Sequence, residues 1–169
     1  MHTYRRRLTR EKVLQVLYAY ELSKEPIALL IENILSELKP QKEDWEFAQK
    51  LIYDVIQHQE EINKFITTTV AHWELNRIAV IDKVLLNMGI CELLYFPDIP
   101  PKVTINEAIE IAKAFSTEKS GKFINGVLDA VLEGLKGTHA LHKTGRGLIN
   151  ESSSRDHRTT GPQSPSKRK

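Results

Sequence analysis

Apolar residues recur every three or four positions along most of the chain, from Leu8 to about Leu135. This spacing places them on one face of a helix and predicts amphipathic helices that share a core. The predicted helices lie around residues 8–20, 27–38, 45–56, 62–70, 78–94, 105–115 and 123–135. No segment alternates convincingly between apolar and polar residues, as a half-buried strand would. The pattern therefore predicts an all-α fold.

Polar residues and prolines mark where several of these helices should begin or end. Pro26 fits the first turn of the second helix, and Pro40 should end that helix. The predicted N-terminal caps of later helices are Asn76 for the fifth, a capping box of Thr104 with Glu107 for the sixth, and Ser120 for the seventh.

The fifth predicted helix is apolar on nearly every side, which is typical of a helix in the middle of a bundle. Cys91 lies in it and is expected to be a core residue. Because it is the only cysteine, no internal disulfide can form, and a cytoplasmic location fits best. Gly126 interrupts the apolar pattern of the last helix without breaking it, and we interpret it as a point of close helix contact.

Charge is distributed unevenly along the chain. Residues 1–12 carry five Lys or Arg and one Glu, residues 13–138 carry 12 basic and 19 acidic residues, and residues 139–169 carry seven and two. An acidic body with basic ends indicates a localised site for a polyanion. The composition change after Gly137 predicts a helical domain over 1–138 and a disordered basic tail over 139–169. No apolar run reaches the roughly 18 residues of a membrane span.

Catalytic signatures are missing from the sequence, so we expect neither an enzyme nor a cofactor. His139 and His142 have helical spacing but no cysteine or carboxylate close by, and no metal site is expected. Glu107 and Glu110 have the spacing of a solvated helix face.

Two features suit RNA better than catalysis. Arg5, Arg6, Arg7 and Arg10 lead into a helix that carries Gln15 and Tyr18, a set able to contact phosphates, hydrogen-bond base edges and stack on bases. Lys119 and Lys122 flank the start of the seventh helix, whose unpaired amides favour an anion. The alternatives are a solvated arginine arm and an ordinary capped helix with exposed lysines.

Several motifs, in the right order over residues 4 to about 136, resemble the NusB family of bacterial antitermination factors. They are the run Arg5–Arg7 with Glu11 and Leu14–Tyr18, the segment Trp73–Lys83, the segment Asp98–Lys113, Phe115-Ser116 and the segment Ser120–Asp129. The resemblance implies a seven-helix fold of two small helical subdomains. It also implies a role in processive antitermination, chiefly on ribosomal RNA operons, as part of the RNA polymerase antitermination complex.

The resemblance further implies binding of boxA RNA, together with the ribosomal protein of the small subunit that acts as NusE, and a possible homodimer. Carried over by position, the RNA-binding residues are Arg5, Arg6, Arg7, Arg10, Gln15, Tyr18, Lys119, Lys122, Phe123 and Asn125. Contacts to the protein partner are Glu74, Arg77 and Asp82. Lys119 departs from the acidic residue that the resemblance implies near this position, and we expect the change to bear on RNA affinity or partner choice. The alternative is a ribosomal-RNA-binding module like that of RNA cytosine methyltransferases, without its catalytic domain.

Overall fold

The computed structural model describes residues 2–70 and 77–149. Within these ranges the chain forms seven α-helices and no strand, as the apolar spacing predicts. The helices are α1 His2–Ser23, α2 Ile27–Leu35, α3 Lys42–Gln57, α4 Gln59–Thr69, α5 Val80–Tyr95, α6 Pro101–Phe115 and α7 Glu118–Gly137. Two short 3₁₀ helices follow α2 and α7: η1 Ser36–Leu38 and η3 Gly145–Leu148.

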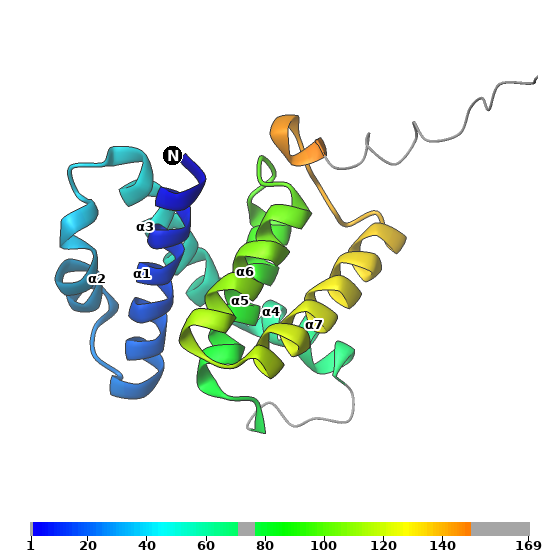
Figure 1. The fold of residues 1–169 in the computed structure, drawn as a ribbon, viewed down its shortest axis with the longest axis horizontal. Helices are drawn as coiled ribbons and strands as arrows, with labels where there is room; N and C mark the ends of the chain where they lie inside the picture. The colour runs from blue at the N-terminus through cyan, green and yellow to red at the C-terminus, as the bar shows by residue number, and fades with distance from the viewer. Residues whose placement is uncertain (1, 71–76, 150–169) are drawn as a thin grey trace, which may run out of the picture.

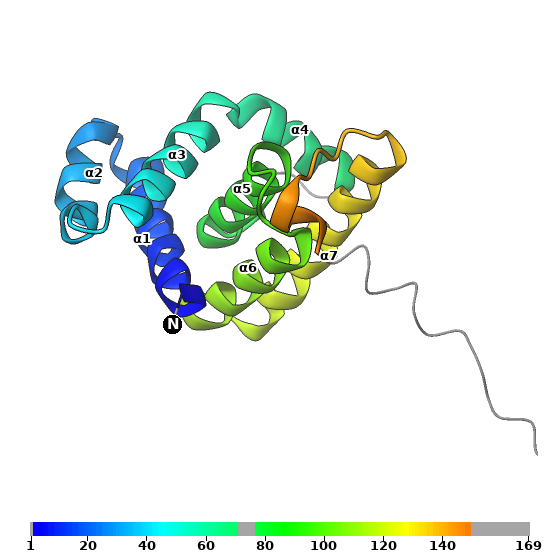
Figure 2. The same ribbon diagram turned by 90° about the horizontal axis from the view of Figure 1, so that it is seen from above.

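Helix α5 lies at the centre of the fold. Figure 1 shows α1, α2 and α3 on one side and α4, α6 and α7 on the other, and Figure 2 shows α5 enclosed between them. It packs against α1, α3, α4, α6 and α7, whereas α2 packs chiefly on α1. Every residue from Val84 to Leu93 is buried. The apolar periphery of this helix, visible in the sequence, is therefore explained by neighbours on all sides.

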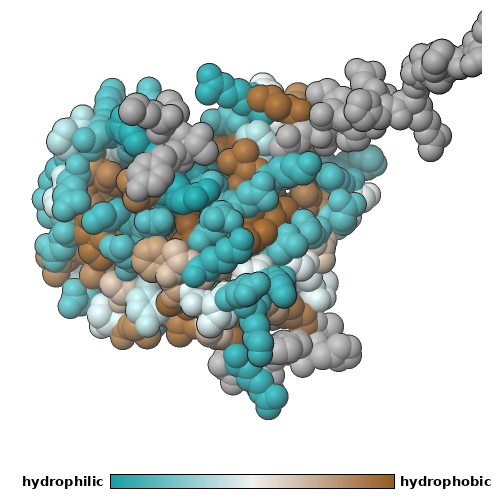
Figure 3. Space-filling view, viewed as in Figure 1, coloured by the Kyte–Doolittle hydropathy of each residue, from teal (hydrophilic) through white to brown (hydrophobic). Residues whose placement is uncertain are grey.

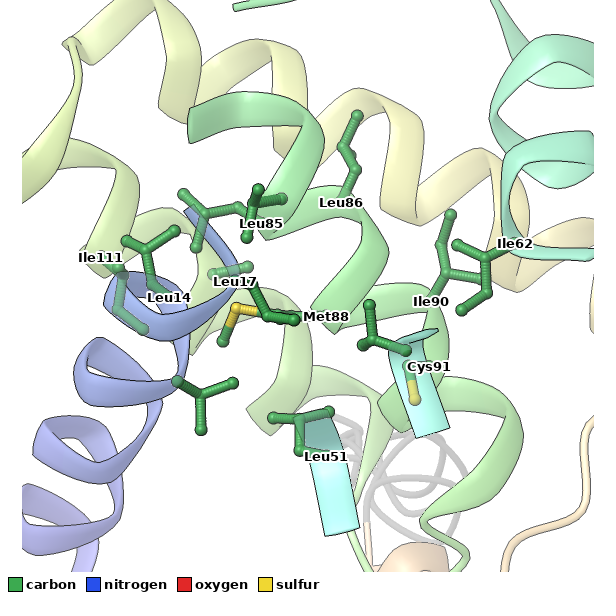
Figure 4. Close-up of a cluster of buried hydrophobic side chains, with 14 of the residues drawn as sticks. Leu14, Leu17, Leu51, Ile62, Leu85, Leu86, Met88, Ile90, Cys91 and Ile111 are labelled. Atoms are coloured by element: carbon green, nitrogen blue, oxygen red, sulfur yellow. The ribbon is translucent and has the colours of Figure 1, made fainter. Parts of the chain in front are cut away.

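The buried side chains of α5 join the two sides of the molecule into one core. Figure 4 shows Leu85, Met88 and Cys91 of α5 among buried residues of α1, α3, α4 and α6. Cys91 is fully buried, and this burial raises the pKa of its thiol far above the ordinary value. Its role as a core residue is thus confirmed.

Close helix contacts occur at other glycines than the expected one. A Cβ at Gly126 would meet nothing within 4 Å, so the interpretation of Gly126 as a contact point is wrong. Instead, a Cβ at Gly89 of α5 would lie 2.9 Å from Leu128 Cδ1 of α7. Gly121 at the start of α7 lies beside Ile109 of α6, with 3.6 Å from an added Cβ to Ile109 Cγ2. A side chain at Gly89 would therefore displace Leu128, which is fully buried between the helices.

Three predicted helix starts are corrected. Helix α5 begins at Val80 with Ala79 as its N-cap, and Asn76 lies outside the described residues. Helix α6 begins at Pro101, so Thr104 and Glu107 lie inside it, buried, and form no capping box.

Helix α7 is capped by Thr117, whose side chain accepts a hydrogen bond from the Ser120 amide at 3.1 Å. Ser120 is therefore a buried first-turn residue that is bonded to the cap and not the cap itself.

The structure also describes the first residues of the predicted tail. His139 adopts a left-handed conformation (φ 56°), and the chain then runs back across the end of α5, where Gly147 is buried. Figure 1 shows this segment, in orange, over the ends of α5 and α6. The predicted tail thus begins with residues that pack on the helical body, and its remainder, 150–169, lies outside the described residues.

Candidate nucleic-acid interface

The arginine-rich start of α1 is held to the rest of the fold by three buried carboxylates. The most enclosed pair is Arg10 with Glu92 of α5, both at most 5 % exposed. Arg10 Nε and Nη2 donate to the two carboxylate oxygens of Glu92 at 2.6 and 3.0 Å, and Thr104 Oγ1 donates to the same carboxylate at 2.9 Å. Burial opposes the charge of Arg10, but Glu92 outweighs it, and the pKa of Arg10 is raised. Arg10 is therefore a structural residue, which corrects its assignment to the RNA surface.

Arg7 forms a second bidentate ion pair, with Glu107 of α6. Its Nε and Nη2 each lie 2.9 Å from an oxygen of Glu107, and this hydrogen bonding raises the pKa of Arg7. Glu107 is only 4 % exposed, so the interpretation of Glu107 as part of a solvated face is wrong. The Arg7 side chain stays 34 % exposed at its outer edge.

Asp44 at the start of α3 holds the first two arginines. Arg5 Nη2 donates to Asp44 Oδ2 at 2.8 Å, and Arg6 Nε lies 3.9 Å from Asp44 Oδ1. The Arg6 guanidinium also lies 4.3 Å from the ring centroid of Phe47, a cation–π contact. Of the four arginines, only Arg5 has a mostly exposed side chain, at 58 %.

Sequence reasoning identified the arginines but missed the carboxylates that bind them. Glu92 carried a usable signal, since it is the only acidic residue in the last three turns of an otherwise apolar helix. A charged residue in that position is buried and needs a partner. Asp44 carried no comparable signal, because it sits among exposed charged residues at a helix start.

The remaining candidates on α1 lie at the surface. Gln15 is exposed and Tyr18 is half-buried, one turn further along the helix. Both side chains project from the face opposite to fully buried Val13 and Val16. Their position allows an amide and an aromatic ring to reach a ligand at this surface.

The start of α7 presents a second group of candidates. Lys119, Lys122 and Asn125 are exposed, and Phe123 is half-buried against the core. Lys113 of α6, which sequence reasoning missed, lies next to them: its Cγ is 3.7 Å from the position of a Cβ on Gly121. Lys113 pairs with exposed Glu110, an arrangement that leaves it in solvent.

The two groups of candidates lie on helices that both pack against α6. Helix α6 contacts both α1 and α7, and Figures 1 and 2 agree in placing the first turns of α1, the end of α6 and the start of α7 along the face turned toward the viewer in Figure 1. Figure 3 shows that hydrophilic residues cover much of this face. The fold therefore places the lysines of α7 and the helix that carries Gln15 and Tyr18 against the same helix, α6.

The three residues assigned to a protein partner have different positions. Glu74 lies outside the described residues, and Arg77 is exposed just before α5. Asp82 is only 7 % exposed, and its Oδ1 has no hydrogen-bond partner among the described atoms. A side chain so enclosed presents little surface to another protein, which corrects the expectation for Asp82.

Other kinds of site are not seen in the part of the chain that the structure describes. There, no three His, Cys, Asp or Glu side chains converge as metal ligands would. None of the described helices is long and apolar enough to cross a membrane.

Comparisons with known proteins agree with this architecture. The NusB family model matches residues 7–133. A transcription antitermination protein NusB from Chloroherpeton thalassium is 47% identical over 150 residues, which cover 86% of this chain and 69% of that protein. The structure of NusB from T. maritima superposes with a TM-score of 0.71 at 39% identity, covering 76% of this chain and 90% of that one.

A crystal structure of the antitermination factors NusB and NusE in complex with double-stranded RNA contains a similar chain. It superposes with a TM-score of 0.68 at 27% identity, covering 79% of this chain and 99% of that one. On the strength of the family model and of these relatives, the chain belongs to the NusB family, whose members are transcription antitermination factors and not enzymes.

Proposed function

We propose that this protein binds boxA-type RNA together with a NusE-like ribosomal protein, and so acts as an adaptor in the RNA polymerase antitermination complex of the cytoplasm. The observation that carries the proposal is that α6 packs against both α1, with exposed Gln15 and half-buried Tyr18, and α7, with exposed Lys119 and Lys122 at its start. Neither lysine forms an ion pair with any described residue, so both are available to phosphate groups. The related complex of NusB, NusE and RNA supports the choice of partners.

The chemistry of this face suits a nucleic acid that is held by several weak contacts. Lysines at its edge neutralise phosphates, and the Tyr18 ring and the Gln15 amide offer stacking and base-edge hydrogen bonds. Arg5 and the outer edge of Arg7 add positive potential, although both are already bonded to carboxylates. The excess of acidic residues over residues 13–138 favours a basic ribosomal protein, through steering more than through affinity.

A salt titration of binding to a boxA-type RNA tests the lysines directly. The double variant Lys119→Ala/Lys122→Ala should lower the slope of log K against log salt by about 1.4, because each lost single-strand phosphate contact contributes about 0.7. The melting temperature should not change, since both side chains are exposed. An unchanged slope would show that the RNA binds elsewhere.

The matched control is Lys42→Ala/Lys136→Ala, which removes the same charge from exposed ion pairs on α3 and at the far end of α7. Its slope should stay close to that of the parent protein. Replacing the arginines of α1 is a poorer test, because loss of Arg7 leaves the buried Glu107 carboxylate unpaired and destabilises the fold.

Light scattering with and without RNA shows whether a homodimer exists and competes with RNA.

A further inference from the structure

A short segment after α7 closes over the end of the central helix. We call residues 140–149 the strap. The amides of Ala140 and Leu141 donate to Leu135 O at 2.9 and 3.3 Å, which turns the chain back at His139, and Leu141 packs on the core. The strap lies beyond residues 7–133, the part that the family model matches. The match to the family model therefore says nothing of its contacts.

Lys143 attaches the strap to the C-terminal end of α5. Its Nζ donates to Glu92 O at 3.0 Å and to Phe96 O at 2.8 Å, two carbonyls at the helix end that also accept from the amides of Phe96 and Ile99. A cation there also interacts favourably with the negative end of the helix dipole. Burial lowers the pKa of Lys143 to about 8, and the nearby carboxylates of Glu92 and Asp98 act in the opposite direction.

The second attachment point is the turn between α5 and α6. The Thr144 amide donates to Pro97 O at 2.9 Å. Gly147 lies so close to this turn that an added Cβ would be 2.0 Å from Pro97 O. Because no side chain fits there, the approach of the strap to the turn depends on glycine at this position.

The strap and the arginines of α1 meet at one residue. The backbone carbonyl of Glu92 accepts from Lys143, while its carboxylate accepts from Arg10 and from Thr104. We propose that Lys143 is a positioning residue: by fixing the last turn of α5, the strap sets the position of the Glu92 carboxylate and, through Arg10, the position of α1 at the RNA-binding face. The expected effect on RNA rests on the proposed function, whereas the positioning of Glu92 and Arg10 by Lys143 does not depend on it.

Lys143→Met removes both donations and keeps most of the side-chain stem. Two measurements follow on folded protein: the hydrogen-exchange rate of the Arg10 Nε–H, which the Glu92 carboxylate now protects, and affinity for a boxA-type RNA. We expect Arg10 Nε–H exchange to accelerate at least roughly tenfold and RNA affinity to fall about five- to tenfold, a size typical of substitutions along a coupled network. Lys143→Arg, which retains donors and charge, should recover part of both.

Lys136→Met is the matched control, since it removes the same charge from an exposed position seven residues earlier. In the described structure the Lys136 ammonium group pairs with exposed Glu133 alone. Both readouts should then match the parent protein. If Lys143→Met behaves like Lys136→Met in Arg10 exchange, the positioning role is wrong. If neither the parent protein nor any variant binds RNA, but Arg10 Nε–H exchange responds as expected, the proposed function is wrong and the positioning role of Lys143 is supported.

Gly147→Ala covers the case in which Lys143→Met does not fold. Its Cβ forces the strap away from Pro97 without changing any charge. Faster exchange at Arg10 Nε–H is again expected, and unchanged exchange would overturn the proposal.

Discussion

Arg7 and Arg10 lie three residues apart on α1, and each binds both oxygens of one carboxylate on another helix. Breaking such a pair costs more than the pair contributes, because the partner left behind is a buried charge without compensation. The cost depends on enclosure: the Arg10 and Glu92 side chains are 5 % and 2 % exposed, whereas Arg7 is 34 % exposed. The Arg10 pair should therefore dominate the stability of this region.

Replacing Glu92 with glutamine tests this directly. Glu92→Gln removes the charge opposite Arg10 and replaces one of the two oxygens that accept from Arg10 and Thr104 with an amide nitrogen that cannot accept. We expect the free energy of unfolding to fall by about 3–5 kcal/mol, the range for a broken buried pair, in urea denaturation. Glu110→Gln, which disrupts an exposed pair with Lys113, should cost less than about 0.5 kcal/mol. Equal losses in the two variants would mean that burial of the Arg10 pair is unimportant.

The sequence showed which residues are basic but not which are bonded. Arg10 and Lys119 are both cations on a helix, yet one is buried against Glu92 and the other is exposed. The difference arises from residues about 80 positions away, which no local pattern reveals. Lys119, Lys122 and Gln15 remain at the surface because no apolar or acidic side chain of another helix covers them.

At the scale of elements, apolar spacing located all seven helices, since each must bury one face. The ends were less predictable because several residues compete to cap a helix. Thr117 and Ser120 are both good capping residues, and the choice depends on how α7 packs against α6. Contact glycines are equally ambiguous: Gly89 and Gly126 look alike in sequence, but only Gly89 faces another helix.

These two glycines give opposite expectations for the same substitution. Gly126→Ala should stabilise the protein by about 0.5–1 kcal/mol, because alanine favours the helix and the site is open. Gly89→Ala should destabilise it by about 1–3 kcal/mol, because its Cβ would press on fully buried Leu128. Thermal melts of both variants at one pH make the comparison. Stabilisation by Gly89→Ala would show that α5 and α7 can move apart at little cost.

At the scale of the whole molecule, we expect the helices that do not pack on α5 to open more easily than those that do. Five helices pack against α5, and their buried leucine and isoleucine side chains each contribute about 1.5–3 kcal/mol. Helix α2 rests chiefly on α1 and buries only Leu30, Ile31 and Leu35. Helix α1 belongs to both regions, since it packs on α2 and is bonded to α5 and α6 through Arg10 and Arg7.

Native-state hydrogen exchange should resolve this hierarchy. Amides of α5 can exchange only when the whole molecule unfolds, whereas α2 can open with the loss of few contacts, so α2 amides should exchange at least roughly 100-fold faster. In the parent protein, the amides of α1 should be as well protected from exchange as those of α5. In Glu92→Gln the tie between α1 and α5 is weakened, and α1 protection should fall toward that of α2 while α5 remains the slowest. Uniform protection across α1, α2 and α5 in both proteins would instead mean that the molecule opens as a single unit. The arginine pairs would then contribute to the global free energy of unfolding without making any helix open separately from the others.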